Sequence, residues 1–232
     1  MIKGDGWIKY CIWEHSTQVK ELYARRCRLE EPEMDCSSQA VELLAPYVTP
    51  GDILLDVGCG SGYFFHSLKK RQILVEYFGI DSASSLIDIG RNCLASYGLP
   101  PENLQVMRIE DMDGEVDHIV CINVLSNIDN YHRPLERMLL CARKTVIIRE
   151  SVKKQAEYLY VHDKYLDPGK NLKVYVNAYG MQELMEFIES YGFKVRYVID
   201  WHTKGKSQMV IGYPHYWKFF VAEKVSPVEV AS

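Results

Sequence analysis

The sequence lacks any continuous run of 18 apolar residues, and its first residues contain no apolar core as long as that of a signal peptide. It also lacks a cluster of Lys and Arg, and its formal net charge is -4. It therefore carries no electrostatic signature of binding to a nucleic-acid backbone or an anionic membrane. These absences predict a cytoplasmic protein that binds neither nucleic acid nor membrane.

No CxxC pair is present, and the seven cysteines are scattered singly. Several lie inside apolar runs such as "HIVCIN". An odd number of isolated cysteines in apolar surroundings favours reduced, mostly buried thiols over a disulfide framework or a zinc site. No group of histidines has a metal-ligand spacing with supporting acids, so we expect no metal.

Internal repeats and low-complexity segments are also missing. Short strand patterns alternate instead with helical patterns, which indicates βαβ units and hence an α/β, doubly wound, mostly parallel sheet covered on both faces. The patterns predict helices at 14–29, 37–47, 62–71, 82–98, 133–142 and 181–192. They predict seven strands, at 53–57, 73–81, 104–109, 117–123, 144–150, 193–201 and 216–224.

The alternation is interrupted at one place, which divides the chain into parts. Residues 1–36 are interpreted as an N-terminal helical lid and 37–224 as the main domain. Within that domain, 151–179 has no regular pattern and is interpreted as an insertion on the substrate side. We expect residues 225–232 to form a disordered tail.

The stretch "ILLDVGCGSGYFF", residues 53–65, combines a buried strand with glycines at every second position. Gly58, Gly60 and Gly62 follow the strand directly, at the edge where parallel sheets bind their ligands. A dinucleotide fingerprint would need a third small residue at Tyr63 or Phe65, and both are aromatic. This disfavours a nicotinamide-dependent dehydrogenase, which stays as a less favoured alternative.

The pattern "LLDVGCGSG" resembles the first motif of the class I S-adenosylmethionine-dependent methyltransferases, an acid-x-Gly-x-Gly-x-Gly loop. The resemblance covers roughly residues 37–224. It implies a Rossmann-like seven-stranded sheet with an antiparallel last strand, and S-adenosyl-L-methionine as cofactor. The motif residues that it assigns to the cofactor are Asp56, Gly58, Cys59, Gly60 and Gly62.

Three later positions are similar to the family's as well. Asp81 ends the next strand, where the resemblance implies a carboxylate that accepts from both ribose hydroxyls. Asp111 and Met112 would bind the adenine, with Glu110 as the rival acid. Asn123 begins the segment expected beside the methionine part. The chain departs from the family in having "CARK" before the fifth strand and a stretch after Asp111 too short for a helix.

The acceptor side is rich in aromatic residues, because nine of the sixteen tyrosines lie between Ser151 and Tyr216. A binding surface lined by tyrosine rings and hydroxyl groups suits a polar or cyclic small molecule. We therefore expect methyl transfer to a small polar molecule, at a hydroxyl oxygen, with a saccharide as one hypothesis. A hydroxyl acceptor benefits from a general base, and the candidates are His162, Asp163 and His215.

Other readings stay open. The strand end "NVLSN" lacks the Asn/Asp-Pro-Pro-aromatic quartet of enzymes that methylate amino groups of nucleic acids, but N-methylation of a small molecule or a protein remains an alternative. So does a catalytically silent cofactor-binding subunit, and a homodimer is compatible with the sequence. Arg25 or Arg26 could face an anionic ligand, although a solvated helix face is the simpler interpretation.

Overall fold

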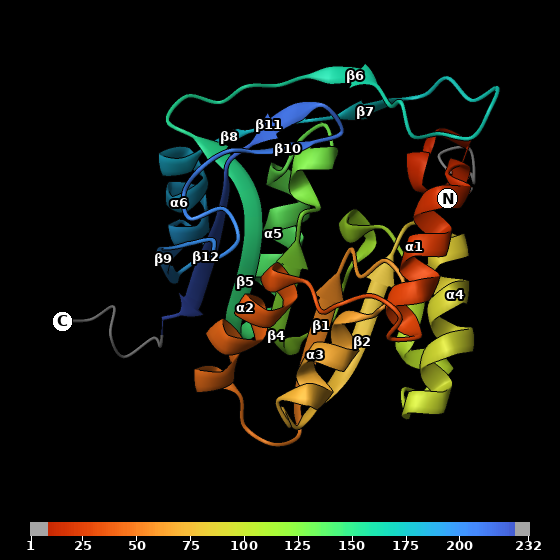
Figure 1. Cartoon of the computed structure of the whole chain (residues 1–232). Helices are drawn as coiled ribbons and strands as arrows, with labels where there is room; N and C mark the ends of the chain where they lie inside the picture. The colour runs from red at the N-terminus through yellow and green to blue at the C-terminus, as the bar shows by residue number, and fades with distance from the viewer. Residues whose placement is uncertain (1–8, 226–232) are drawn as a thin grey trace.

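One sheet runs through the molecule and contains all seven predicted strands (Figure 1). The computed structural model describes residues 9–225. The strands of the sheet are β1 (Asp52–Val57), β2 (Val75–Asp81), β3 (Leu104–Val106), β4 (Val116–Ile122), β5 (Ala142–Lys153), β8 (Tyr179–Gly180), β9 (Phe193–Ile199) and β12 (Trp217–Lys224). Their order is β3-β2-β1-β4-β5-β12-β9, and the short β8 pairs with β5.

The directions of the strands confirm the predicted Rossmann-like, doubly wound architecture. Strands β1 to β5 pair in parallel, whereas β12 is antiparallel to both of its neighbours, β5 and β9. Parallel strands end at the same edge of a sheet, so the residues that follow β1, β2 and β4 lie close together.

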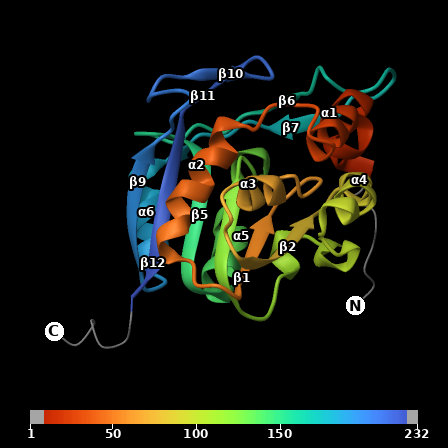
Figure 2. The same ribbon diagram turned by 60° about the horizontal axis from the view of Figure 1, so that its bottom comes forward.

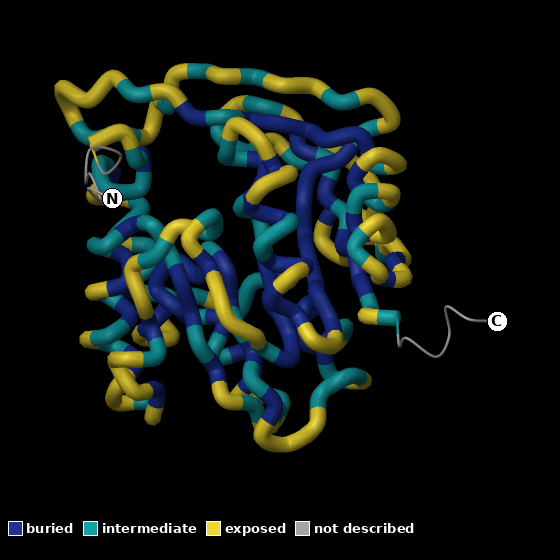
Figure 3. Tube along the Cα trace, turned by 180° about the vertical axis from the view of Figure 1, so that it is seen from behind, coloured by how far each residue is buried: buried dark blue, intermediate teal, exposed yellow. Residues whose placement is uncertain are grey.

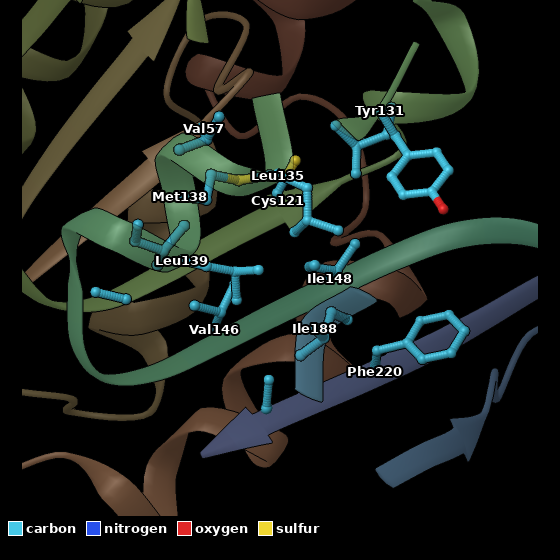
Figure 4. Packing of buried hydrophobic residues seen from close by; sticks show 14 of the residues in the cluster. Val57, Cys121, Tyr131, Leu135, Met138, Leu139, Val146, Ile148, Ile188 and Phe220 are labelled. Carbon is cyan, nitrogen blue, oxygen red and sulfur yellow. The ribbon is translucent and has the colours of Figure 1, made fainter. Parts of the chain in front are cut away.

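Helices cover both faces of the sheet. They are α1 (Thr17–Cys27), α2 (Asp35–Leu44), α3 (Phe64–Lys70), α4 (Ser84–Leu94), α5 (His132–Cys141) and α6 (Met181–Glu189). One buried cluster joins the sheet to α2, α3 and α4, and a second joins it to α5 and α6. Figure 2 shows α2 and α3 on the near face of the sheet, and Figure 4 shows Leu135, Met138 and Leu139 of α5 packed towards Val146 and Ile148 of β5.

Two hairpins extend beyond the carboxyl ends of the parallel strands (Figures 1 and 3). The first, β6 (Tyr160–His162) with β7 (Lys173–Tyr175), lies in the predicted insertion. The second, β10 (Gln208–Val210) with β11 (Tyr213–His215), is absent from the sequence prediction. Its strands have three residues each, too few for an alternating pattern to stand out.

Some predicted boundaries are wrong. The helix expected over 14–29 is a 3-10 helix, Ile12–His15, followed by α1, because the backbone of Ser16 is extended and its Oγ accepts from the N–H of Val19. Strand β5 continues to Lys153, so the expected insertion begins inside a strand. The strand expected over 104–109 stops at Val106.

All seven cysteines are free, and five of them are buried, as expected from the sequence. Within residues 9–225, no helix is both long and apolar enough to cross a bilayer. The tail predicted at 225–232 lies outside the described residues, apart from Val225.

Candidate cofactor and acceptor site

The glycine loop connects β1 to α3 and has a backbone that only glycine adopts readily. Gly58, Gly60 and Gly62 have φ angles of 71°, 58° and 74°, all in the left-handed region. The N–H groups of Gly58 and Cys59 both donate to the carbonyl oxygen of Ile80, at 2.8 and 3.0 Å. The loop is thereby attached to the end of β2.

Protein side chains press against this loop from two sides. A Cβ atom on Gly60 would lie 2.2 Å from Cε1 of Tyr23 in α1, and one on Gly58 would lie 2.3 Å from Cγ2 of Val124. The absence of side chains is therefore required by the packing of α1 and of the β4 end, in addition to any ligand. Burial raises the pKa of the Tyr23 hydroxyl to about 12, so that group is protonated at neutral pH.

Asp81 lies at the end of β2, beside the glycine loop. Its Oδ2 accepts a hydrogen bond of 2.8 Å from the N–H of Gly60, and its Oδ1 accepts one of 2.8 Å from the N–H of Ala83. Burial raises the pKa of this carboxyl group, opposed by these hydrogen bonds. Each oxygen of a carboxylate has a further lone pair, so Asp81 can still accept hydrogen bonds from a diol.

Asp56 lies below the loop, in the core. It is 4% exposed, and its Oδ2 accepts a hydrogen bond of 2.7 Å from the hydroxyl of Tyr77 in β2. Burial in apolar surroundings raises its pKa to about 7. The structure thus places Asp56 where it supports the loop from underneath, and Cys59 is buried as well.

The two residues expected to bind the adenine differ in how far they are buried. Asp111 is exposed at the end of a 3-10 helix, Ile109–Asp111. Met112 is buried in the core cluster under α5, and its carbonyl oxygen accepts from Arg137. The rival acid, Glu110, forms an ion pair of 3.2 Å with Arg108. The structure therefore does not bring the Met112 side chain to the surface of the site.

Asn123 follows β4 and has a left-handed backbone, with φ at 62°. Its N–H donates to the carbonyl oxygen of Arg149 at 2.9 Å, and its Oδ1 accepts from the Arg149 guanidinium. The Asn127 side chain donates to the carbonyl oxygen of Asn123 at 3.1 Å. Asn123 is thus held between the ends of β4 and β5.

Glu150 organises the same loop, and the sequence analysis did not identify it. Its carboxylate is fully buried and accepts hydrogen bonds from the backbone N–H groups of Val124, Leu125 and Ser126, at 2.8, 2.6 and 2.9 Å. It lies two residues after the apolar run "VII", at the end of the predicted strand 144–150, and this position is a usable signal because an acid buried in a strand needs donors.

A buried ion pair lies behind Asn123. Nε of Arg149 donates to Oδ2 of Asp200 at 2.7 Å, and both side chains are almost fully buried. The Arg149 guanidinium also lies 4.4 Å from the centre of the Trp217 ring, on which the ring of His215 stacks at 4.7 Å. The structure thereby connects the predicted His215 to the predicted Asn123.

His215 is buried, and burial lowers its pKa below the usual value for histidine. Its Nδ1 lies 3.1 Å from the carbonyl oxygen of Tyr213. The other two candidate bases lie on the β6–β7 hairpin, apart from this network. The His162 side chain is exposed, and its ring forms no hydrogen bond within residues 9–225. Asp163 accepts from the N–H of Tyr165 in a turn at 2.7 Å.

The N-terminal segment and the insertion are joined above the site. Oγ of Ser16 donates to the carbonyl oxygen of Tyr165 at 2.8 Å, and the N–H of Thr17 donates to Oδ1 of Asp167 at 2.8 Å. Glu14 accepts from the N–H of Ser85 near the start of α4, at 3.2 Å. The beginning of α1 is thus attached both to the insertion and to the helix that follows Asp81.

Comparison with known proteins agrees with this geometry. A family model described as a methyltransferase domain matches residues 55–146, which include the glycine loop, Asp81 and Asn123. No curated protein matches the chain.

Several solved structures share the fold. Magnesium protoporphyrin IX methyltransferase (ChlM) from Synechocystis PCC 6803 with bound SAH has a TM-score of 0.62 at 15% identity, covering 96% of this chain and 100% of that one. An S-adenosylmethionine-dependent methyltransferase from Clostridium acetobutylicum ATCC 824 has a TM-score of 0.62 at 12% sequence identity. The match covers 89% of this chain and 97% of that one. The CcbJ methyltransferase from Streptomyces caelestis has a TM-score of 0.59 at 12% sequence identity. The match covers 92% of this chain and 98% of that one.

Proposed function

We propose that this chain is a class I S-adenosylmethionine-dependent methyltransferase and that it transfers a methyl group to a hydroxyl oxygen of a small polar molecule. The assignment to this family is supported by the match of the family model over residues 55–146 and by the fold. The methyl donor of the family is S-adenosylmethionine. The observation that carries the proposed site is the 2.8 Å hydrogen bond from Gly60 to Asp81. It joins the glycine loop to the acid at the end of the next strand.

The residues at this edge fit such a cofactor. The loop 58–62 would lie against its methionine and ribose parts, Asp81 would accept from the ribose hydroxyls, and Asn123 would flank the methionine part. When bound, the cofactor supplies an electrophilic methyl group on a sulfonium. The chain then has to align the acceptor with that methyl group and exclude water, which can lower a barrier by about 7 to 11 kcal/mol.

His215 is the residue that we propose as general base. Its lowered pKa keeps the ring neutral at pH 7, so that a ring nitrogen can accept the proton of an acceptor hydroxyl. Its contact with Trp217 connects it, through Arg149, to Asn123. His162 and Asp163 are the weaker candidates, because neither is part of this network.

The N-terminal helix and the insertion would close the acceptor space together. Tyr158, Tyr160 and Tyr165 of the insertion are exposed, and aromatic faces of this kind suit a sugar ring or another polar cyclic acceptor. The hydrogen bonds from Ser16 to Tyr165 and from Thr17 to Asp167 support the role of residues 1–36 as a lid that acts with the insertion.

Calorimetric titration with S-adenosylhomocysteine, with NADH in parallel, tests the proposed cofactor. We expect micromolar binding of the first ligand alone; binding of NADH alone would reject the proposal. Candidate acceptors are then screened as pairs of matched alcohols and amines, with the formation of S-adenosylhomocysteine as the readout. If only the amines are turned over, the proposed acceptor atom is nitrogen and not oxygen. On an alcohol acceptor, His215→Gln should lower kcat about 100-fold, and His162→Gln should have little effect.

A further inference from the structure

A cavity of about 450 Å³ lies beside α3, apart from the proposed cofactor site. Its wall is formed by the end of α1, by the segment 28–34 that connects α1 to α2, and by α3. Neither the glycine loop 58–62 nor Asp81 or Asn123 lines it. Small-molecule sites in proteins have volumes of about 300 to 1,000 Å³, so this cavity is large enough for a second ligand.

The wall of this cavity contains apolar and aromatic side chains. Leu29, Pro32 and Met34 come from the connecting segment, and the rings of Tyr63 and Tyr97 come from the residues before α3 and after α4. Such side chains can cover the apolar body of a ligand, and the two rings favour a planar one. The charged groups of the wall then decide which charge the ligand carries.

Both acidic residues of the wall are already paired with cations. Glu31 forms an ion pair of 2.7 Å with Arg25, and Glu33 forms one of 2.7 Å with Lys70. A cationic ligand would have to compete with these side chains for the two carboxylates. The acids of the wall therefore give no preference for a cation.

Arg26 lines the same cavity and has no anionic partner. In the part of the chain that the structure describes, it forms neither an ion pair nor a hydrogen bond, although it is half-buried. Its guanidinium lies 5.3 Å from the centre of the Tyr23 ring and 5.1 Å from that of Tyr63, and these contacts leave its N–H donors free. Lys69 adds a positive charge, because its partner is the uncharged carbonyl oxygen of Tyr97. The wall thus favours an anion.

Two hydroxyl groups add donors to this wall. Ser37 is only 3% exposed and lines the cavity, and its hydroxyl forms no hydrogen bond within residues 9–225. The hydroxyl of Tyr63 donates to Sδ of Met34 at 3.1 Å, and a thioether is a weak acceptor. Both hydroxyls are therefore available to an oxygen of a ligand, together with the guanidinium of Arg26.

We infer that this cavity is a second ligand site, which binds a small planar, apolar carboxylic acid. The carboxylate would accept hydrogen bonds from Arg26 and Ser37, because a guanidinium can bind both oxygens of a carboxylate at once. The apolar body would lie against Pro32, Met34 and the ring of Tyr63. This site is separate from the cofactor site, and the inference does not depend on the proposed reaction.

The test uses two probes of the same shape, 2-naphthoate and its uncharged amide, 2-naphthamide. Calorimetric dissociation constants for both are measured with the wild-type chain, Arg26→Met and the control Arg28→Met. Arg28 has the same charge but pairs with Glu30 at 2.8 Å and does not line the cavity. We expect the wild type to bind the carboxylate at least about 10-fold more tightly than the amide. Arg26→Met should weaken the carboxylate by about 10- to 100-fold and the amide by less than about twofold, and Arg28→Met should change neither.

The inference would be overturned by equal affinities of the wild type for the two probes, or by no binding of the carboxylate at about 1 mM. An unchanged affinity of Arg26→Met for the carboxylate would overturn it as well. If Arg26→Met does not fold, Ser37→Ala serves instead and should weaken the carboxylate alone, by about 3- to 10-fold.

A competition experiment separates this site from the cofactor site, because the cofactor also carries a carboxylate. The titration of the wild type with 2-naphthoate is repeated at saturating S-adenosylhomocysteine. We expect the dissociation constant to stay within about twofold, as it does for sites without coupling. Displacement of the probe would place it in the cofactor site and overturn the inference. Failure of S-adenosylhomocysteine to bind would reject the proposed function, whereas the two probes and the variants would still decide on this site.

Discussion

Oε1 of Glu150 accepts a hydrogen bond of 2.6 Å from the backbone N–H of Leu125, which ties the end of β5 to the loop after β4. The same carboxylate accepts from Val124 and Ser126, so one side chain satisfies three consecutive N–H groups. Hydrogen bonds to a buried charged group are among the stronger ones in proteins. The loop that contains Asn123 thus has its conformation set from the neighbouring strand.

Glu150→Gln should destabilise the protein, because an amide N–H₂ would face backbone N–H donors. We expect the free energy of unfolding in urea to fall by about 2 to 4 kcal/mol. Glu189→Gln, at an exposed position on α6, is the matched control and should change it by less than about 0.5 kcal/mol. Equal stabilities of the two variants would show that the three hydrogen bonds contribute nothing net.

Asp81→Ala tests the proposed ribose contact. Loss of a carboxylate that accepts two hydroxyl groups should weaken the binding of S-adenosylhomocysteine by roughly 2 to 4 kcal/mol, measured by calorimetry. Asp88→Ala, on the exposed side of α4, removes the same charge and should leave the dissociation constant unchanged. An unchanged constant for Asp81→Ala as well would limit its role to the bonds with Gly60 and Ala83.

Asp56 should make stability depend on pH. Its pKa is raised from 3.8 to about 7 by burial, so the native state holds this proton more tightly than the unfolded state does. The resulting stabilisation is complete below about pH 4 and is lost as the pH rises through about 7. Relative to Asp56→Asn, the wild type should lose about 2 to 4 kcal/mol between pH 4 and about pH 8 in urea unfolding. A difference that stays constant over this range would contradict the assignment. Glu150 also has a raised pKa but is present in both proteins, so it cancels.

Gly60→Ala should cost stability for two separable reasons. The left-handed φ of 58° is unfavourable for alanine by about 1 to 2 kcal/mol, and the new Cβ would lie 2.2 Å from the Tyr23 ring. In a Tyr23→Ala background only the first cost remains. A double-mutant cycle in urea should therefore give a coupling of about 1 to 3 kcal/mol, and no coupling would mean that Tyr23 moves aside freely.

The predicted parts of the fold are those that depend on local patterns. The strand β1 and the loop of Gly58, Gly60 and Gly62 are readable because a buried apolar run and a left-handed backbone leave a direct mark on residue type. The hairpin β10–β11 and the extension of β5 to Lys153 were missed. The two strands of the hairpin pair only with each other and are too short to leave an alternating pattern. The extension of β5 pairs with β8, which lies more than 25 residues further along the chain.

The site shows the same division. The seven strands of the sheet and the glycine loop were predictable from local patterns in the sequence. The acids Asp56 and Asp81 were found through the resemblance of these patterns to a known family. The burial of Met112 and the connection of His215, rather than His162, to Asn123 became visible only once the chain was folded. These outcomes depend on which side chains meet across elements far apart in the chain, and no local pattern records that.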